Sequence, residues 1–158
     1  MQCKEFLDIR VRENGVLRER SLDFEVALNQ TIDSSLHRCR HAMSVLHDLC
    51  RFLEAESQQQ FGEEETLLYA AVEYKLPRLR SLLAELRQEH DVFRQLLEDF
   101  RCELVHFNVS GQLRNLLGLG AELVSNLRHH VDREEYELHS VVLQEFEDED
   151  LPGLGSSV

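Results

Sequence analysis

Residues 127–138 read Leu-Arg-His-His-Val-Asp-Arg-Glu-Glu-Tyr-Glu-Leu, and this stretch decides the fold of the chain. Around a helix, its apolar positions recur at steps of mostly three and four residues and form one stripe. Glu134 lies on that stripe, and His130 flanks it one turn earlier. A carboxylate on a buried face needs a metal, a cationic partner or a proton to offset its lost hydration. The apolar members of the stripe are Leu113, Leu117, Val124, Leu127, Val131, Leu138 and Val142.

The composition predicts a single acidic domain. With 158 residues, 2 prolines and 7 glycines, the chain is long enough for one core and is expected to be mostly helical. A net charge of −13 argues against nucleic acid and anionic membrane surfaces as partners. No apolar run approaches the roughly 18 residues of a membrane span. The four cysteines are scattered and no secretory signal is evident, so we expect a cytoplasmic protein.

Residues 1–22 differ from the rest of the chain and predict a β-hairpin. Apolar and charged positions alternate between Phe6 and Leu22 around the dipeptide Asn14-Gly15. Asn-Gly is the strongest short hairpin signal. An isolated hairpin needs something to pack against. We therefore expect this extension to lie on a helical domain at 23–147, which a flexible acidic and Gly-rich tail at 148–158 follows.

A second helical stripe begins at Ile32 and predicts one long helix that ends near Lys75. A kink is expected near Gly62, because one glycine weakens a helix without ending it. The apolar part of the stripe contains Ile32, Leu36, Cys39, Met43, Leu46, Cys50 and Leu53. The same register then continues without a reset through Ser57, Gln60, Glu64, Leu67, Ala71 and Tyr74.

A third stripe follows the turn at Pro77, and a break at 108–111 separates it from the final helix at 112–147. The chain therefore predicts an all-α fold, an up-down antiparallel helical bundle with a short N-terminal β-hairpin. The third stripe contains Leu79, Leu83, Leu86, His90, Phe93, Leu97, Phe100 and Leu104.

Side chains that can bind a metal or a proton interrupt all three stripes: Gln60, Glu64, His90, His130 and Glu134. Glu64 lies 13 residues before Pro77 and His90 lies 13 after it, so both are about 20 Å from that turn. His90 and His130 likewise lie 20 residues before and after Ser110. In an antiparallel bundle these groups meet in one polar layer.

The polar layer has the chemistry of a metal site. A histidine and a carboxylate at i and i+4 can hold one ion, and mixed nitrogen and oxygen ligands suit iron, manganese or zinc. A metal would also stabilise the charge of Glu134 on its apolar face. A buried Glu–His hydrogen-bond network without metal would satisfy the same layer, and the residues alone leave this alternative open.

The other histidines are expected in solvent or at the rim of the bundle, because they lie off the stripes or have no matching ligand. They are His37, His41, His47, His106, His129 and His139.

Three short motifs resemble those of hemerythrin-like (HHE) domains. Gln60-Phe61-Gly-Glu-Glu64-Glu65 resembles their His-Phe-x-x-Glu-Glu motif, and Leu86-Arg-Gln-Glu-His90 resembles their Leu-x-x-Glu-His helix. Leu127-x-x-His130-x-x-x-Glu134 is similar to their final His-x-x-x-Glu pair. The resemblance implies a four-helix bundle with a non-haem diiron site for oxygen or nitric oxide binding, iron sensing or iron handling. By residue, it implies Glu64, His90, His130 and Glu134 as metal ligands.

Two departures from the family pattern shorten this ligand set. Gln60 stands where the family has a ligand histidine, and an amide oxygen is a poor replacement. The histidine of the family's first helix is also missing. With a hairpin at 1–22, only residues 21–31 remain for a first helix, so one wall of the bundle would be open. We expect the hairpin or a second chain in a homodimer to cover it.

The expected function is metal binding. We expect non-haem iron, mono- or dinuclear, with zinc or manganese as alternatives, at Glu64, His90, His130, Glu134 and Gln60. A small gas is the expected further ligand, with a role in sensing or storage, and no catalytic motif indicates an enzyme. The alternative is a metal-free bundle that keeps the scaffold for protein–protein interaction.

Overall fold

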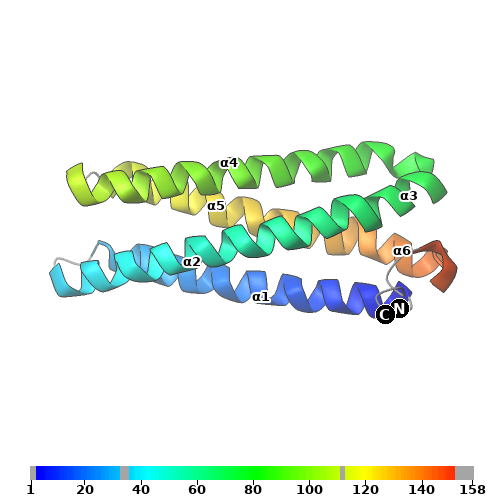
Figure 1. The fold of residues 1–158 in the computed structure, drawn as a ribbon, viewed down its shortest axis with the longest axis horizontal. Coiled ribbons are helices and arrows are strands. Elements are labelled where there is room, and N and C mark those ends of the chain that lie inside the picture. Colours follow the sequence, from blue (N-terminus) through cyan, green and yellow to red (C-terminus); the bar gives the residue numbers. More distant parts are fainter. Residues whose placement is uncertain (1–2, 33–35, 111–112, 152–158) are drawn as a thin grey trace.

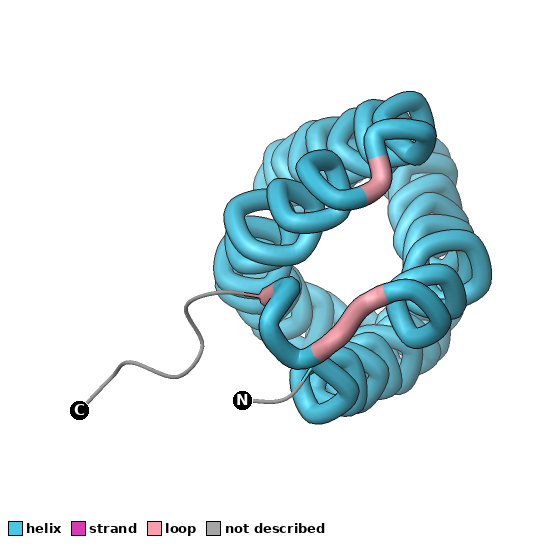
Figure 2. The backbone as a smooth tube through the Cα atoms, turned by 90° about the vertical axis from the view of Figure 1, so that its right-hand side faces the viewer, coloured by secondary structure: helices cyan, strands magenta, loops and turns pink. Residues whose placement is uncertain are grey.

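The computed structural model describes residues 3–32, 36–110 and 113–151, which form a bundle of four helical rods. The rods lie side by side and run up and down in turn, so that α1 begins and α6 ends at the same end of the bundle (Figure 1). Seen along its length, the bundle encloses one common interior (Figure 2). The all-α bundle predicted from the sequence is confirmed.

The elements follow one another along the four rods. The first rod is α1 (Cys3–Gln30), and the second joins α2 (Leu36–Glu63), the π-helical η1 (Glu64–Tyr69) and α3 (Ala70–Lys75). A 3-10 turn, η2 (Pro77–Leu79), leads into the third rod, α4 (Arg80–Ser110). The fourth rod joins α5 (Leu113–Arg133), the π-helical η3 (Glu134–His139) and α6 (Ser140–Glu145), and the short η4 (Asp148–Asp150) follows.

The predicted N-terminal β-hairpin is wrong, because residues 3–30 form α1 and the described part of the chain contains no strand. The residues that α1 buries have helical spacing, but Arg10, Asn14 and Ser21 among them are polar, which hid the stripe. Val11 contributed to the apparent alternation, yet it is 46% exposed. The full set of buried positions is Cys3, Phe6, Leu7, Arg10, Asn14, Leu17, Ser21, Phe24, Ala27 and Leu28.

The helix α1 supplies the wall of the bundle that was expected to be open. It packs against both α2 and α5. The Arg128 guanidinium donates to both carboxylate oxygens of Glu25 at 2.9 and 2.8 Å, and Arg18 donates to Asp132 and Glu135. The structural reason for expecting a homodimer is therefore gone, and the homodimer itself stays a prediction.

The second rod reaches Lys75 as expected, but its register does not continue unbroken. A π-helical turn holds one residue more than an α-helical turn, so η1 rotates every later position. After Glu64 the buried residues are Leu68, Tyr69 and Val72, whereas Tyr74 is 91% exposed. The expected placement of Tyr74 on the core stripe is therefore wrong.

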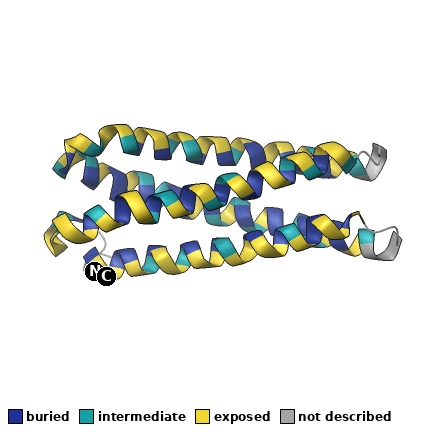
Figure 3. Ribbon diagram, turned by 180° about the vertical axis from the view of Figure 1, so that it is seen from behind, coloured by how far each residue is buried: buried dark blue, intermediate teal, exposed yellow. Residues whose placement is uncertain are grey.

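Apolar side chains fill the interior as two separate clusters. The buried positions follow the inner faces of the rods (Figure 3). One cluster, which includes Leu46 and Phe100, lies toward the α1–α2 connection, and the other, which includes Phe6 and Leu138, lies toward the termini. The polar layer separates the two.

The residues that follow α6 close the end of the bundle near the termini. The backbone N–H of Cys3 donates to Asp148 Oδ1 at 3.0 Å, and Lys75 pairs with Asp150. Leu151 is buried in the second apolar cluster. The start of the predicted flexible tail therefore packs on the bundle, and its remainder, 152–158, lies outside the described residues. No helix in the described ranges has the length and apolar character needed to cross a membrane.

The helical assignment of residue 15 predicts the effect of a single substitution. A Cβ at Gly15 would meet nothing within 4 Å, so Gly15→Ala should raise the free energy of unfolding by about 0.5–1 kcal/mol. Chemical denaturation followed by circular dichroism measures this change.

Gly118 in α5 provides a matched control, because a Cβ there also meets nothing within 4 Å. Gly118→Ala should give a similar gain. Gly120→Ala should not, because its Cβ would lie 2.6 Å from Leu28 Cδ2 and 3.1 Å from Phe100 Cε2. A hairpin turn at residue 15 would instead make Gly15→Ala destabilising.

Candidate metal centre

Glu64, His90 and His130 meet in the polar layer between the two apolar clusters. They come from η1, α4 and α5, all three are buried, and one ligand atom of each lies within 4.8 Å of the others. Nε2 of His90 lies 3.0 Å from Nε2 of His130 and 3.3 Å from Oε2 of Glu64. Three rods thus bring nitrogen and oxygen atoms to one point.

The opposite ring nitrogens determine which tautomer each histidine adopts. Nδ1 of His90 lies 2.6 Å from Glu65 Oε1, and Nδ1 of His130 lies 2.8 Å from Glu89 Oε2. A ring nitrogen at that distance from a carboxylate carries the proton and donates it. In the neutral histidines, both Nε2 atoms are therefore unprotonated and present lone pairs to each other.

Two arginines hold these outer carboxylates in place. Arg94 donates to Glu65 Oε1 at 3.2 Å, and Arg133 donates to Glu89 Oε1 at 2.7 Å. Partial burial acts to raise the pKa of Glu89, but hydrogen bonds from His130 and Arg133 outweigh it and hold that pKa below its usual range. Glu89 is therefore an ionised carboxylate that accepts a hydrogen bond from Nδ1–H of His130.

Aromatic packing and burial keep His90 neutral. Its ring stacks on Phe61 with 3.9 Å between centroids and 7° between planes. Burial lowers the pKa of His90 to about 4, even though the contact with Glu65 acts in the opposite direction. The ring is thus fixed in position and keeps a free lone pair at neutral pH.

Glu64 and Glu134 are buried carboxyl groups with incomplete hydrogen bonding. Burial raises the pKa of both to about 8, and the charge of Glu64 adds to the effect on Glu134. Glu134 Oε1 accepts a hydrogen bond of 3.0 Å from the Tyr69 hydroxyl. Among the described residues, Oε2 of Glu64 and Oε2 of Glu134 have no hydrogen-bond donor. A cation beside either oxygen would satisfy it. Glu64 belongs to the group of three residues whose ligand atoms lie within 4.8 Å of one another, and Glu134 lies outside that group.

Gln60 contributes a hydrogen-bond donor to this layer. Asn14 Nδ2 donates to Glu135 Oε1 at 3.2 Å, so its Oδ1 is turned toward Gln60. Gln60 Nε2 donates to that Oδ1 at 2.5 Å and to Glu64 Oε1 at 3.0 Å. The amide NH2 of Gln60, and not its oxygen, therefore faces Glu64.

Arg10 brings a positive charge to the same side of the layer as Asn14. Its side chain is 4% exposed and pairs with Glu63 at 2.6 Å and Glu13 at 3.0 Å. Its charge acts to lower the pKa of Glu64 and of Glu134. One side of the layer thus holds a fixed organic cation and two amides.

Besides Arg10 and Asn14 of α1, sequence reasoning missed two inward-facing polar residues on the other rods, Tyr69 and His139. Five residues of α-helix turn through about 500°, which would place them about 140° away from Glu64 and Glu134. The π-helical turns η1 and η3 instead bring both inside. His139 is therefore buried, 3.8 Å from Glu134 Oε1, and its expected position at the rim is wrong. The repeat of Glu-Glu five residues before Tyr69 and before His139 is the signal that could have found them.

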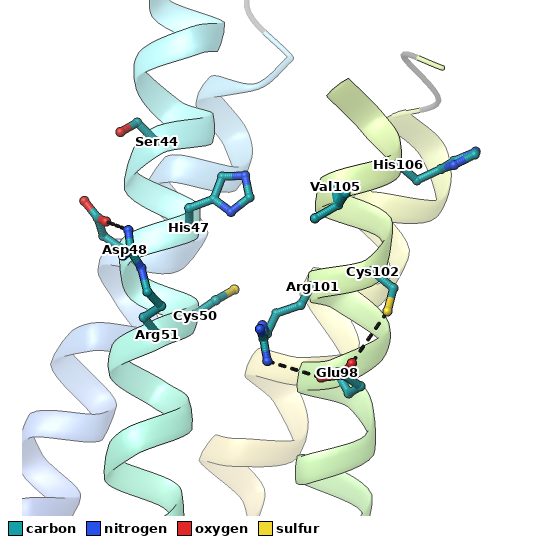
Figure 4. A pocket seen from close by; sticks show the side chains of 10 residues that line it. All are labelled: Ser44, His47, Asp48, Cys50, Arg51, Glu98, Arg101, Cys102, Val105 and His106. Atoms are coloured by element: carbon teal, nitrogen blue, oxygen red, sulfur yellow. Dashed lines mark hydrogen bonds and ion pairs between the residues drawn. The ribbon is translucent and has the colours of Figure 1, made fainter. Parts of the chain in front are cut away.

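The other histidines with described side chains add no ligand atom to the group formed by Glu64, His90 and His130. His41 is exposed, His129 is 69% exposed, and the side chain of His37 lies outside the described residues. His47 lines a groove of about 930 Å³ between α2 and α4 (Figure 4).

The groove between α2 and α4 contains no residue of the polar layer. Its two arginines have acidic neighbours, since Arg51 donates to Asp48 at 2.7 Å and Arg101 donates to Glu98 at 3.3 Å. We therefore place the candidate centre inside the bundle and not in this groove.

Comparison with known proteins adds one finding to this geometry. The sequence model of a protein family, the hemerythrin HHE cation binding domain, matches residues 7–142 of the chain. No curated protein and no solved structure matches the chain. The family match covers most of the chain, from the early part of α1 to α6, and contains every residue of the polar layer. The chain therefore belongs to the hemerythrin HHE cation-binding domain family.

Proposed function

We propose that this protein binds one non-haem iron ion between Glu64, His90, His130 and Glu134. The observation that carries the proposal is the pair of Nε2 atoms 3.0 Å apart, each without a proton because its opposite nitrogen donates to a carboxylate. Two facing lone pairs repel each other unless a cation lies between them.

The spacing of the donor atoms fits a shared ion. Two ligands that each lie about 2.0–2.2 Å from one ion, at angles of about 90–110°, are about 2.8–3.6 Å apart. His90 Nε2 lies 3.0 Å from His130 Nε2 and 3.3 Å from Glu64 Oε2. Mixed nitrogen and oxygen donors suit iron, and zinc or manganese also fits them. When bound, iron supplies a Lewis-acidic and redox-active centre.

The amide side of the layer favours one ion over two. Gln60 turns an NH2 group toward Glu64 and is held there by Asn14. The nearby Arg10 guanidinium supplies a positive charge that partly offsets the carboxylates. On this side, a second cation would meet the N–H groups of Gln60 and the positive charge of Arg10. Neither can act as a metal ligand. In this proposal Gln60 acts through its NH2 group as a partner of the ligand Glu64, and its Oε1 has no hydrogen-bond partner among the described residues.

The site is suited to a small ligand. It lies between two apolar clusters, and its three central side chains are at most 2% exposed. These features support binding of a small gas such as oxygen or nitric oxide, with a role in sensing or in iron storage. They do not favour conversion of a larger substrate.

The alternative function is a metal-free scaffold for protein–protein interaction. In such a protein, a proton shared by the two Nε2 atoms would remove the repulsion between their lone pairs. Metal analysis distinguishes the two proposals, because the scaffold requires no bound ion. Protein purified without chelator should contain iron if the metal proposal holds.

Removing two of the proposed ligands should abolish metal binding without unfolding the bundle. The variant His130→Ala with Glu134→Ala should lose the bound ion, since only Glu64 and His90 remain of the four ligands named here. Elemental analysis measures the metal content, and circular dichroism measures the helix content. His129→Ala, at the exposed neighbouring position, should keep its metal. A full equivalent of iron in the double variant would contradict the assigned site.

A second ion should bind once the amide side of the layer carries ligands. The variant Asn14→His, Gln60→His and Arg10→Leu adds two imidazoles beside Glu64 and removes the guanidinium charge. Its metal content should rise from one ion to two per chain, measured by elemental analysis. Arg10→Leu alone, which adds no ligand, should keep one ion. Two ions in the wild-type chain would contradict the single-ion site.

The buried carboxyl groups predict how the stability of the metal-free protein depends on pH. With pKa values of about 8 instead of 4.5, Glu64 and Glu134 bind more protons in the folded than in the unfolded state. Their contribution to stability is therefore present at low pH and is lost as the pH rises toward 8. Glu134→Gln removes one of them, so its advantage over wild type should grow by up to about 1.4 kcal/mol per pH unit between pH 6 and 8.

Urea denaturation in the presence of a chelator at pH 6, 7 and 8 measures this difference. Glu5→Gln, at an exposed position of α1, should show no such trend. A constant difference between Glu134→Gln and wild type would show that Glu134 does not titrate in this range.

A further inference from the structure

The chain has three tyrosines, and they differ sharply in burial. Tyr69 is 0% exposed, whereas Tyr74 and Tyr136 are 91% and 83% exposed. Tyr69 lies at the end of η1, five residues after Glu64. A regular helix would turn it away from Glu64, so its inward position depends on the π-helical turn. Such turns occur frequently at functional sites.

The Tyr69 hydroxyl points into the candidate metal centre. It donates to Glu134 Oε1 at 3.0 Å, and its oxygen lies 3.4 Å from His90 Nε2. The Tyr69 ring lies nearly parallel to the His90 ring, with 5.6 Å between centroids and 13° between planes. The phenol oxygen therefore approaches the same nitrogen atom that Glu64 and His130 approach.

Three atoms that could bind a metal thus lie at similar distances from His90 Nε2. They are His130 Nε2 at 3.0 Å, Glu64 Oε2 at 3.3 Å and Tyr69 Oη at 3.4 Å. Ligands of one ion at metal–ligand distances of about 2.0–2.2 Å lie about 2.8–3.6 Å apart. The distance from the phenol oxygen to His90 Nε2 falls within this range, as does the distance from Glu64 Oε2.

We propose that the Tyr69 phenol oxygen is an additional ligand of the metal ion, which makes the site selective for iron(III). This inference rests on the proposed function, since it assigns one more residue to the same ion. Phenolate is a hard, anionic oxygen ligand, and such ligands favour the more highly charged oxidation state of iron.

Coordination replaces the O–H bond of Tyr69 by an O–metal bond and releases one proton to the solvent. Burial, together with the charges of Glu134 and Glu64, raises the pKa of Tyr69 well above its ordinary value. The phenol thus keeps its proton in the metal-free chain and donates it in the hydrogen bond to Glu134. With Tyr69 as a ligand, Glu134 Oε1 would lose this hydrogen-bond donor.

The experiment loads the full chain with iron(III) and records its visible absorption and resonance Raman spectra. A phenolate ligand gives a broad charge-transfer band in the visible, and excitation in that band enhances tyrosine ring vibrations. Wild type should show both signals. Tyr69→Phe should lose them while keeping bound iron, and it should release iron to a chelator at least about tenfold faster.

Tyr136→Phe and Tyr74→Phe are the matched controls and should keep the band. Ring-deuterated tyrosine in the wild-type chain should shift the enhanced vibrations, and this measurement stands even where Tyr69→Phe fails to fold. An iron(III)-loaded wild type without the band, or a Tyr69→Phe variant that keeps it, would overturn the assignment of Tyr69. A wild-type chain that binds no iron would instead overturn the proposed function.

Discussion

Two imidazole nitrogens that face each other across 3.0 Å impose the strongest constraint on this molecule. Each ring is held by a carboxylate on its far side, and each carboxylate is held in turn by an arginine. This outer shell determines the tautomers, and the tautomers leave two lone pairs directed at one point. Two lone pairs at this distance repel each other, and a cation between them would remove the repulsion. The packing of the bundle must therefore hold the two rings in place.

The π-helical turns η1 and η3 adapt regular helices to this requirement. Each begins at a carboxylate of the polar layer, Glu64 or Glu134, and each brings a second polar side chain inside five residues later. The second and fourth rods thus share one feature, a π-helical turn that places two polar side chains inside the bundle. An unbroken α-helix would present only one of the two side chains to the interior.

The two sides of the polar layer differ in how they balance buried charge. On one side, the Nε2 atoms of His90 and His130 face each other and form the candidate cation site. On the other side, the Arg10 guanidinium and the amides of Asn14 and Gln60 supply positive charge and hydrogen bonds from the chain itself. A fixed cation cannot exchange, so this side stabilises the carboxylates permanently, whereas the histidine side depends on what it binds.

The sequence by itself determined the helical stripes, the up-down order of the rods and the shared height of Glu64, His90 and His130. These follow from local periodicity and from distances along helices, which regular geometry converts into positions. Only the tertiary structure decided that residues 3–30 are helical, because polar side chains on the buried face of α1 find partners on other rods. It also decided the inward turn of Tyr69 and His139, because a π-helical turn changes the register by one residue and leaves no mark in the apolar pattern.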